Sequence, residues 1–154
     1  MSATATIEEA RQAIVEEFSI LGDWMQRYEY IIELGRALPG LPEKLRVDSH
    51  RVQGCQSRVW FYATRDRDLI HYRADSDAMI VRGLIALLLR VYSGRRAEDI
   101  LATSPAFLEV LGLGSHLSGS RANGLHAMVK RIHAFAHAHA TATETAEIDP
   151  RALA

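Results

Sequence analysis

The sequence contains a single cysteine, Cys55, among 154 residues. One thiol excludes an intramolecular disulfide, a Cys-X-X-Cys redox pair, an all-cysteine zinc site and a cysteine-ligated iron–sulfur cluster built from one chain. Because nothing in the composition exploits an oxidising compartment, it favours the cytoplasm. Cys55 is then an inert buried thiol, an incidental residue, or a reactive thiol that acts alone.

Strong net charge and long apolar segments are also missing. Eighteen Lys and Arg residues oppose nineteen Asp and Glu residues, which gives no global attraction to nucleic acid or to an anionic membrane. The longest strongly apolar run, residues 83–89, is far shorter than the ~20 residues that cross a bilayer. Glu8 and Glu9 stand near an N-terminus without a basic start, so we expect no secretory signal and a cytoplasmic protein with neither nucleic-acid nor membrane partners.

The first forty residues show helical patterns. Thr6 and Glu9 match a capping box, and apolar residues recur behind them at helical spacing. Asp23 suits the N-cap of a second helix. Two prolines and a glycine within residues 39–42 should end that helix, and an ordered loop should follow to about residue 50.

The middle of the chain has the alternation of a β-hairpin. Residues 57–64 and 69–74 are rich in β-branched and aromatic side chains, and the polar residues 65–68 connect them. A short connection between two adjacent strands predicts antiparallel pairing. The pattern of residues 51–52 is also that of an extended segment, which makes them a candidate for a further strand.

A long helix is predicted from Asp75 or Ser76 to Gly94, with Asp75 and Asp77 as caps at its start. It is apolar nearly all round, and Arg82 belongs to its single narrow polar stripe, so we expect it to pack centrally against the hairpin. Short helices should follow at 97–102 and 106–111, and the last helix should begin at residue 118 or 120. We predict one α+β domain over residues 1–140, with a small antiparallel sheet of about three strands packed against several helices, and a disordered tail over 141–154.

Cys55 lies between two extended segments, directly after Gly54, which permits a tight connection. His50, Arg51 and Arg58 are close in sequence and positive surroundings lower a thiol pKa. A lone cytoplasmic cysteine is more often an inert buried one, but the polar loop setting disfavours that interpretation. Local sequence leaves both open.

His126, Lys130, His133 and His137 share one face of the last predicted helix. His133 and His137 could hold a metal, yet no carboxylate or thiol nearby in the helix completes a tetrahedral set. This spacing therefore favours a solvent-facing basic stripe. Arg121, near the start of the same helix, is either a surface residue or one that positions the cysteine loop.

Several stretches around the lone cysteine, taken in order, resemble the SufE family of sulfur-acceptor proteins, and the likeness runs from residue 7 to residue 135. The stretches that carry it are Arg27-Tyr28-Glu29-Tyr30-Ile31-Ile32-Glu33-Leu34-Gly35, Arg51-Val52-Gln53-Gly54-Cys55-Gln56-Ser57, Asp75-Ser76-Asp77-Ala78, Ile80-Val81-Arg82-Gly83-Leu84 and Ser120-Arg121-Ala122-Asn123-Gly124-Leu125.

The resemblance implies that Cys55 takes sulfur from a SufS- or CsdA-like cysteine desulfurase, carries it as a persulfide and passes it to an iron–sulfur assembly scaffold. The pyridoxal phosphate (PLP) belongs to the desulfurase, so the chain needs no cofactor and is a carrier and activator rather than an enzyme. The implied fold resembles that of IscU, with the cysteine on the loop between the first two strands and residues 51–52 in the first. IscU-like and SufU-like proteins need three cysteines, so scaffold and zinc roles are excluded here.

The predicted site consists of Cys55 as the persulfide carrier and a set of loop-supporting residues. The supporting residues are His50, Arg51, Gly54, Gln56, Ser57 and Arg121. Gly54 should absorb an outward swing of the loop, and His50 and Arg121 should hold the loop or meet the negative charge of the sulfur.

Two other functions would use the same cysteine or dispense with it. A redox-sensing or peroxidatic protein would use Cys55, but its resolving thiol would have to come from another molecule. A docking module that activates a desulfurase would make Cys55 incidental.

Overall fold

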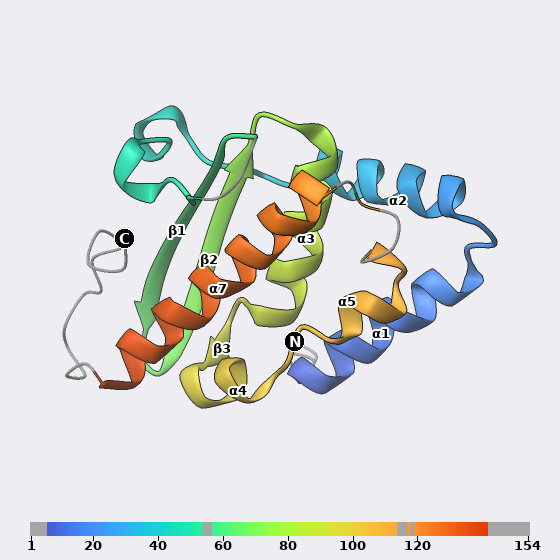
Figure 1. Ribbon diagram of the computed structural model, residues 1–154. Coiled ribbons are helices and arrows are strands. Elements are labelled where there is room, and N and C mark those ends of the chain that lie inside the picture. The colour runs from blue at the N-terminus through green and yellow to red at the C-terminus, as the bar shows by residue number, and fades with distance from the viewer. Residues whose placement is uncertain (1–5, 54–56, 114–116, 118, 142–154) are drawn as a thin grey trace.

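The computed structural model describes residues 6–53, 57–113, 117 and 119–141. A three-stranded antiparallel sheet in the order β1-β2-β3 is covered by helices (Figure 1), which confirms the predicted α+β class. Gly54, Cys55 and Gln56, and residues 142–154 of the predicted tail, lie outside the described residues.

The hairpin consists of β1 (Val59–Asp66) and β2 (Leu69–Ser76), paired from Val59↔Ser76 to Asp66↔Leu69. Each strand ends two residues later than predicted. Because β1 continues to Asp66 and β2 begins at Leu69, the connection is a two-residue turn, in which Arg67 has a φ of 59°. Asn and Asp tolerate this left-handed region better than most residues do, so Arg67 was a poor signal for so tight a turn.

The third strand is not where the sequence predicted it. Residue Arg51 makes one isolated antiparallel bridge to Trp60 rather than a strand. The third strand is β3 (Arg95–Arg96), which pairs with the start of β2. A pair of arginines has neither the β-branched nor the aromatic side chains typical of a strand, so the local sequence did not predict β3. In chain order the cysteine loop therefore precedes the first strand.

The N-terminal helices follow their predicted caps. Helix α1 (Ile7–Ile20) begins with the capping box of Thr6 and Glu9, and α2 (Trp24–Ala37) begins at Asp23, whose side chain accepts the Gln26 N–H at 2.9 Å. The predicted ordered loop contains two short 3-10 helices, η1 (Glu43–Leu45) and η2 (Asp48–His50).

Helix α3 (Met79–Tyr92) is buried centrally, as its apolar composition predicted. It packs against α2 at two glycines. A Cβ on Gly83 would lie 2.0 Å from the Ile31 carbonyl oxygen, and one on Gly35 would lie 2.5 Å from that of Met79. The backbones of α2 and α3 therefore approach so closely that a side chain at either glycine would force them apart.

The described residues form three further helices, α4 (Ala97–Ala102), α5 (Phe107–Val110) and α7 (Gly119–Thr141). Helix α5 lies beside α1, whereas α4 packs against α7 and β3. Helix α7 crosses the hairpin (Figure 1), where the Tyr72 hydroxyl donates to the Ile132 carbonyl oxygen at 2.8 Å. Burial raises the pKa of Tyr72, so it stays a neutral donor. Helix α4 has its predicted bounds, whereas α5 is shorter than the predicted 106–111.

The two faces of the hairpin are covered differently. One face packs under the helices and carries the alternate residues Val59, Phe61 and Ala63 of β1 and Ile70, Tyr72 and Ala74 of β2. On the other face Trp60 pairs with Asp75, and both are buried because residues 38–51 fold over them. The last of those residues, Arg51, bridges to Trp60 at the end of the hairpin where β1 begins.

Candidate functional site

The described residues on both sides of 54–56 form a closed frame. The Val52 N–H donates to the Val59 carbonyl oxygen at 2.9 Å, directly beside the bridge between Arg51 and Trp60. This pairing joins the chain before Gln53 to the chain after Arg58, and we call residues 53–58 the cysteine loop. Within it, Ser57 is partly buried and Gln53 is exposed.

The returning arm of the loop is tied to the end of β2. The Arg58 carbonyl oxygen accepts the Ser76 hydroxyl at 2.7 Å and the Asp77 N–H at 3.3 Å, while the Arg58 N–H donates to Asp77 Oδ1 at 3.1 Å. The Ser76 hydroxyl also accepts the Ala78 N–H at 3.2 Å. The prediction that Asp77 caps a helix was wrong, because its carboxylate binds the loop arm instead.

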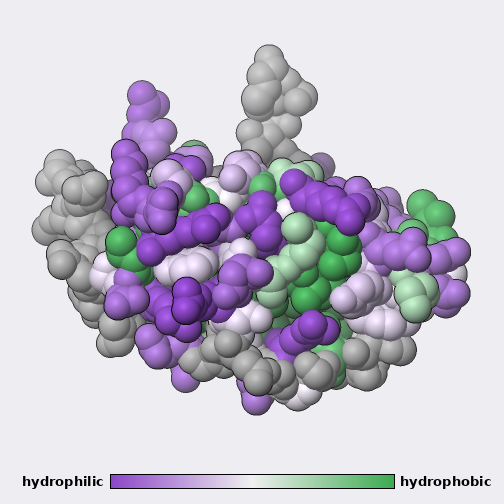
Figure 2. All heavy atoms as spheres, turned by 90° about the horizontal axis from the view of Figure 1, so that it is seen from above, coloured by the Kyte–Doolittle hydropathy of each residue, from purple (hydrophilic) through white to green (hydrophobic). Residues whose placement is uncertain are grey.

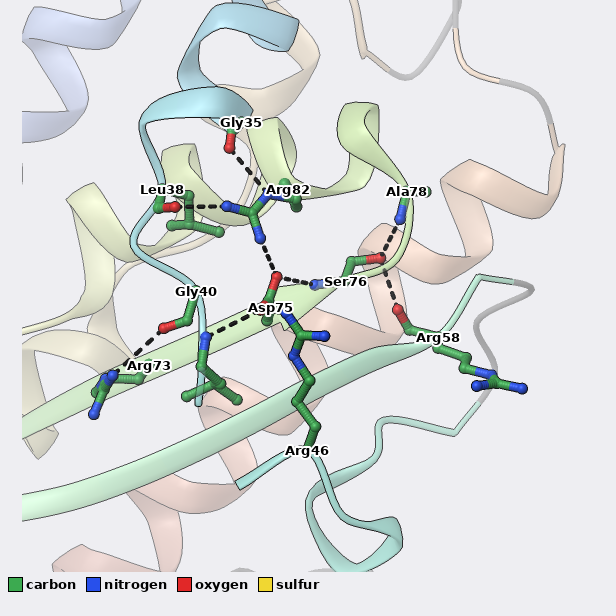
Figure 3. A network of polar contacts seen from close by, with 11 residues as sticks. Gly35, Leu38, Gly40, Arg46, Arg58, Arg73, Asp75, Ser76, Ala78 and Arg82 are labelled. Atoms are coloured by element: carbon green, nitrogen blue, oxygen red, sulfur yellow. Dashed lines mark hydrogen bonds and ion pairs between the residues drawn. The ribbon is translucent and has the colours of Figure 1, made fainter. Parts of the chain in front are cut away.

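Asp75 was also predicted as a cap, and this was wrong too. Its side chain is 1% exposed and holds four donors (Figure 3): Oδ1 accepts the Ser76 N–H at 2.8 Å and the Arg82 guanidinium, while Oδ2 accepts the Leu41 N–H at 3.0 Å and Arg46 at 2.7 Å. A buried carboxylate requires such pairing, because an unpaired charge in the interior is strongly disfavoured.

The electrostatics of this centre keep Asp75 ionised. Burial by itself raises the pKa of Asp75, but the N–H groups of Leu41 and Ser76, the bond from Arg46 and the charge of Arg82 together hold that pKa below its ordinary value. Gly40, with a φ of +75°, lies so close that a Cβ there would be 2.6 Å from Asp75 Oδ2. The 38–41 backbone is therefore fitted directly onto the carboxylate.

Arg82 extends the same network into α2. Its Nε donates to the Gly35 carbonyl oxygen at 3.0 Å and its Nη2 to that of Leu38 at 2.6 Å, as Figure 3 shows. Its side chain is only 18% exposed, so Arg82, which was predicted to belong to a polar stripe on α3, makes its contacts in the interior instead. One arginine thus joins the end of α2, the start of α3 and the end of β2.

Three predicted supporting residues, His50, Arg51 and Ser57, lie on the loop frame. His50 Nδ1 is 2.7 Å from the Leu45 carbonyl oxygen, and its ring centre is 5.1 Å from that of Tyr62, so it holds the 45–50 segment on β1. The Arg51 carbonyl oxygen accepts from Arg131 of α7 at 3.5 Å. The structure brings His50, Arg51 and Ser57 to this end of the hairpin.

The other predicted residues are placed less fully. Arg121 is exposed in the first turns of α7, and its role in positioning the loop stays a prediction. Gly54, Cys55 and Gln56 lie outside the described residues. Sequence reasoning did not assign Arg46, Asp75, Ser76 or Arg131 to the site, because their partners are distant in the chain. The signal that marked Asp75 and Ser76 was their place in a stretch that carries the family resemblance.

The histidines of α7 do not form the predicted uniform stripe. His126 and His137 are exposed, but His133 is partly buried with its ring 5.6 Å from that of Tyr92. Among residues 6–53, 57–113, 117 and 119–141, no group of three or more His, Cys, Asp or Glu side chains could hold a metal ion. No helix in those ranges is both long and apolar enough to span a bilayer.

Comparisons with known proteins agree with these features. Residues 12–136 match the family model described as SufE, Fe-S metabolism associated domain. An uncharacterized SufE-like protein of Rhizobium meliloti is 45% identical over 126 residues, covering 77% of this chain and 89% of that protein. The sulfur acceptor protein CsdE of Escherichia coli is 38% identical over 131 residues, covering 84% of this chain and 86% of CsdE.

The fold has a counterpart among solved structures. The solution structure of a hypothetical protein from Thermus thermophilus superimposes with a TM-score of 0.71 at 22% sequence identity, covering 86% of this chain and 97% of that one. The family match spans the loop frame, the Asp75 centre and most of α7, and on that evidence this chain belongs to the SufE family.

Proposed function

We propose that the chain accepts sulfur from a PLP-dependent cysteine desulfurase and carries it as a persulfide on Cys55. The observation that carries the proposal is the loop of residues 53–58: it contains the only thiol of the chain, and its two ends are fastened to β1 and β2. The name and the 38% identity of CsdE, a sulfur acceptor, support the same role.

The transfer is a thiol–disulfide-type exchange. The Cys55 thiolate attacks the terminal sulfur of the persulfide on the desulfurase. A new S–S bond forms to Cys55 while the S–S bond of the donor breaks, and the donor cysteine leaves as a thiolate. The proton of the donor persulfide stays with the transferred sulfur, so no external oxidant or reductant is needed.

A solitary thiol suits a carrier of sulfane sulfur. A second cysteine in the same chain would attack the persulfide, form a disulfide and release sulfide. With one cysteine, the sulfur stays on Cys55 until another molecule takes it. We propose that this acceptor belongs to cytoplasmic iron–sulfur cluster assembly and that PLP remains with the desulfurase.

The described residues on both sides of Gly54, Cys55 and Gln56 are held by hydrogen bonds. The bonds at Val52, Val59 and Arg58 hold both ends of the loop, so any outward swing of the thiol is confined to the residues between them. Gly54 is the residue in that interval with the widest backbone freedom. Fixed ends would keep the Cys55 thiol at one place relative to the sheet. The residues between those ends would allow the thiol to reach the persulfide of the desulfurase.

The proposal is tested by intact mass after the chain is incubated with its desulfurase and free cysteine. The wild type should gain the mass of one sulfur atom, and dithiothreitol should remove it. Cys55→Ser should gain nothing. Gln53→Ala, at an exposed position of the same loop, is the control and should still be loaded. Equal gains on the wild type and Cys55→Ser would refute the proposal.

A further inference from the structure

Four arginines surround the base of the cysteine loop. Arg51 and Arg58 flank residues 54–56 on the two arms. The guanidinium of Arg46 lies 5.6 Å from the ring centre of Trp60, and Arg131 reaches from α7 to the carbonyl oxygens of Ser49 and Arg51 at 3.4 and 3.5 Å. We call Arg46, Arg51, Arg58 and Arg131 the basic collar.

The collar makes this end of the molecule positive. Residues 46–60 and 75–82 together with Arg131 contain five arginines and three aspartates, an excess of two positive charges, while the whole chain has a net charge of -1. One of the three aspartates, Asp75, is buried and bonded to both Arg46 and Arg82. The rest of the chain therefore has a net negative charge, and the positive charge is local.

The collar is accessible to a partner. Arg58 is exposed and the Arg46 side chain is 42% exposed, whereas Arg51 and Arg131 are partly buried. Burial lowers the pKa of Arg131, yet a guanidinium remains protonated in proteins. Cations that have already lost part of their hydration form stronger contacts with an incoming carboxylate than fully hydrated ones do.

An apolar surface adjoins the collar. Figure 2 views the loop end of the hairpin from above: hydrophilic side chains cover the part that holds η1 and η2, and a hydrophobic patch lies beside it toward α2 and α3. Met79, two residues after the aspartate that binds the Arg58 N–H, is 42% exposed. Protein interfaces commonly combine an apolar centre with a charged rim.

We propose that the basic collar docks an acidic surface of the protein that donates sulfur to Cys55. The inference rests on the proposed function and adds the chemistry of the partner. A compact acidic patch fits better than a nucleic acid, because the negative remainder of the chain would repel an extended polyanion. Opposite charge on the two proteins speeds their encounter and fixes the orientation in which the thiol meets the persulfide.

The test reverses the charge of the two collar residues whose side chains are not needed for the frame. Arg51 and Arg58 contribute backbone bonds to the frame, so Arg51→Glu combined with Arg58→Glu preserves those bonds. The second-order rate constant for sulfur transfer from the desulfurase should fall by about tenfold or more at low salt. The wild-type rate should itself fall as salt is added, and the variant should show little salt dependence.

A matched control carries the same change in charge elsewhere. Arg11→Glu combined with Arg96→Glu alters exposed or partly exposed residues. Strand β3, which carries Arg96, pairs at the end of the hairpin opposite the loop, and α1, which carries Arg11, lies away from the hairpin (Figure 1). This variant should transfer sulfur within about twofold of the wild-type rate. Equal losses in both double variants would show that only net charge matters and would overturn the collar proposal.

A second measurement separates docking from thiol chemistry. Exchange of Cys55 with 4,4′-dithiodipyridine, an uncharged small disulfide, reports thiolate reactivity without a protein surface. The collar variant should lose less than about threefold in this reaction. An equal loss with dithiodipyridine and with the desulfurase would show that the collar acts on the thiol, and would overturn docking.

The outcomes also separate this inference from the proposed function. A wild type that takes no sulfur from the desulfurase refutes the proposed function before any variant is compared. A wild type that is loaded, together with a collar variant loaded equally fast at every salt concentration, refutes only the docking role. Binding of a short RNA that the collar reversal abolishes, without a slower sulfur transfer, would likewise overturn it.

Discussion

Asp75, which is buried, and His133, which is partly buried, have pKa values lowered for opposite reasons. Asp75, at the loop end of the hairpin, is ionised because four donors outweigh the effect of burial. For His133, on α7, burial lowers the pKa and outweighs the opposing hydrogen bond to the Thr103 backbone. The hydrogen-bond donors around Asp75 therefore favour its charged form, whereas His133 has too few acceptors to offset the effect of burial on its charged form.

The surroundings of His133 show why it stays neutral. The Tyr92 hydroxyl also donates to the Thr103 carbonyl oxygen, at 2.9 Å, so the two side chains share an acceptor. Burial raises the pKa of Tyr92 to about 12. His133 Nε2 is buried with no hydrogen-bond partner among the described residues. A proton on that nitrogen would be a charged donor without an acceptor, which is costly in the interior.

The largest effect is expected from Asp75→Ala. Removing the carboxylate leaves the largely buried Arg82 without its counter-ion and the Leu41 N–H without its acceptor, and we expect the free energy of unfolding to drop by about 3–5 kcal/mol. Urea denaturation at neutral pH measures it. The exposed Asp68→Ala, at the other end of the hairpin, should change stability by less than about 1 kcal/mol. Similar effects of the two changes would refute the structural role of the Asp75 centre.

The comparison also predicts two windows of acid sensitivity. The folded-state pKa of each group lies below its unfolded value, so each contributes stability above that value and loses it as the pH falls. For His133 the loss begins as the pH drops from about 6.5, and for Asp75 it begins only below about 4.

The His133 window is tested by His133→Leu. The wild type should lose stability between pH 7 and pH 5, with His133 contributing at most about 1.4 kcal/mol per pH unit, and the variant should show a shallower slope. His126→Leu, an exposed control on the same helix, should keep the wild-type slope. If both variants retain that slope, His133 is not held neutral by the fold.

The smallest effect is expected at an exposed charge. Arg96 pairs with Glu98 and lies 3.5 Å from Asp68, and all three side chains are more than half exposed. We expect Arg96→Ala to change the free energy of unfolding by about 0.5 kcal/mol or less, because solvent screens such pairs. A loss of stability as large as that of Asp75→Ala would mean that burial does not explain why an ion pair at Asp75 matters more than one at Arg96.

Local signals explain what the sequence could predict. Thr6 and Asp23 form their caps within three residues, and the alternation of the hairpin is a property of adjacent residues, so both were readable from the chain. Asp75 was misassigned because an aspartate before a helix is usually a cap. Its actual partners Leu41 and Arg46 are 34 and 29 residues away, and nothing near Asp75 indicates them.

The remaining errors have the same origin. His133 was assigned to a solvent-facing stripe from its spacing, which cannot reveal that Tyr92 and the segment after α4 cover that side of α7. Strand β3 consists of two arginines whose strand state depends on pairing with β2. For the candidate site, the motif around Cys55 indicated the chemistry, while the collar required distant segments to come together.

The central claim is that Cys55 receives sulfur directly from a desulfurase. The most direct measurement is a single turnover: the desulfurase is loaded with persulfide, freed of cysteine and mixed with an equal amount of the chain, and the sulfur on each protein is followed by mass spectrometry. We predict that sulfur leaves the desulfurase as it appears on the peptide that contains Cys55, in equal amounts. Release of that sulfur as free sulfide, with none on Cys55, would contradict the claim.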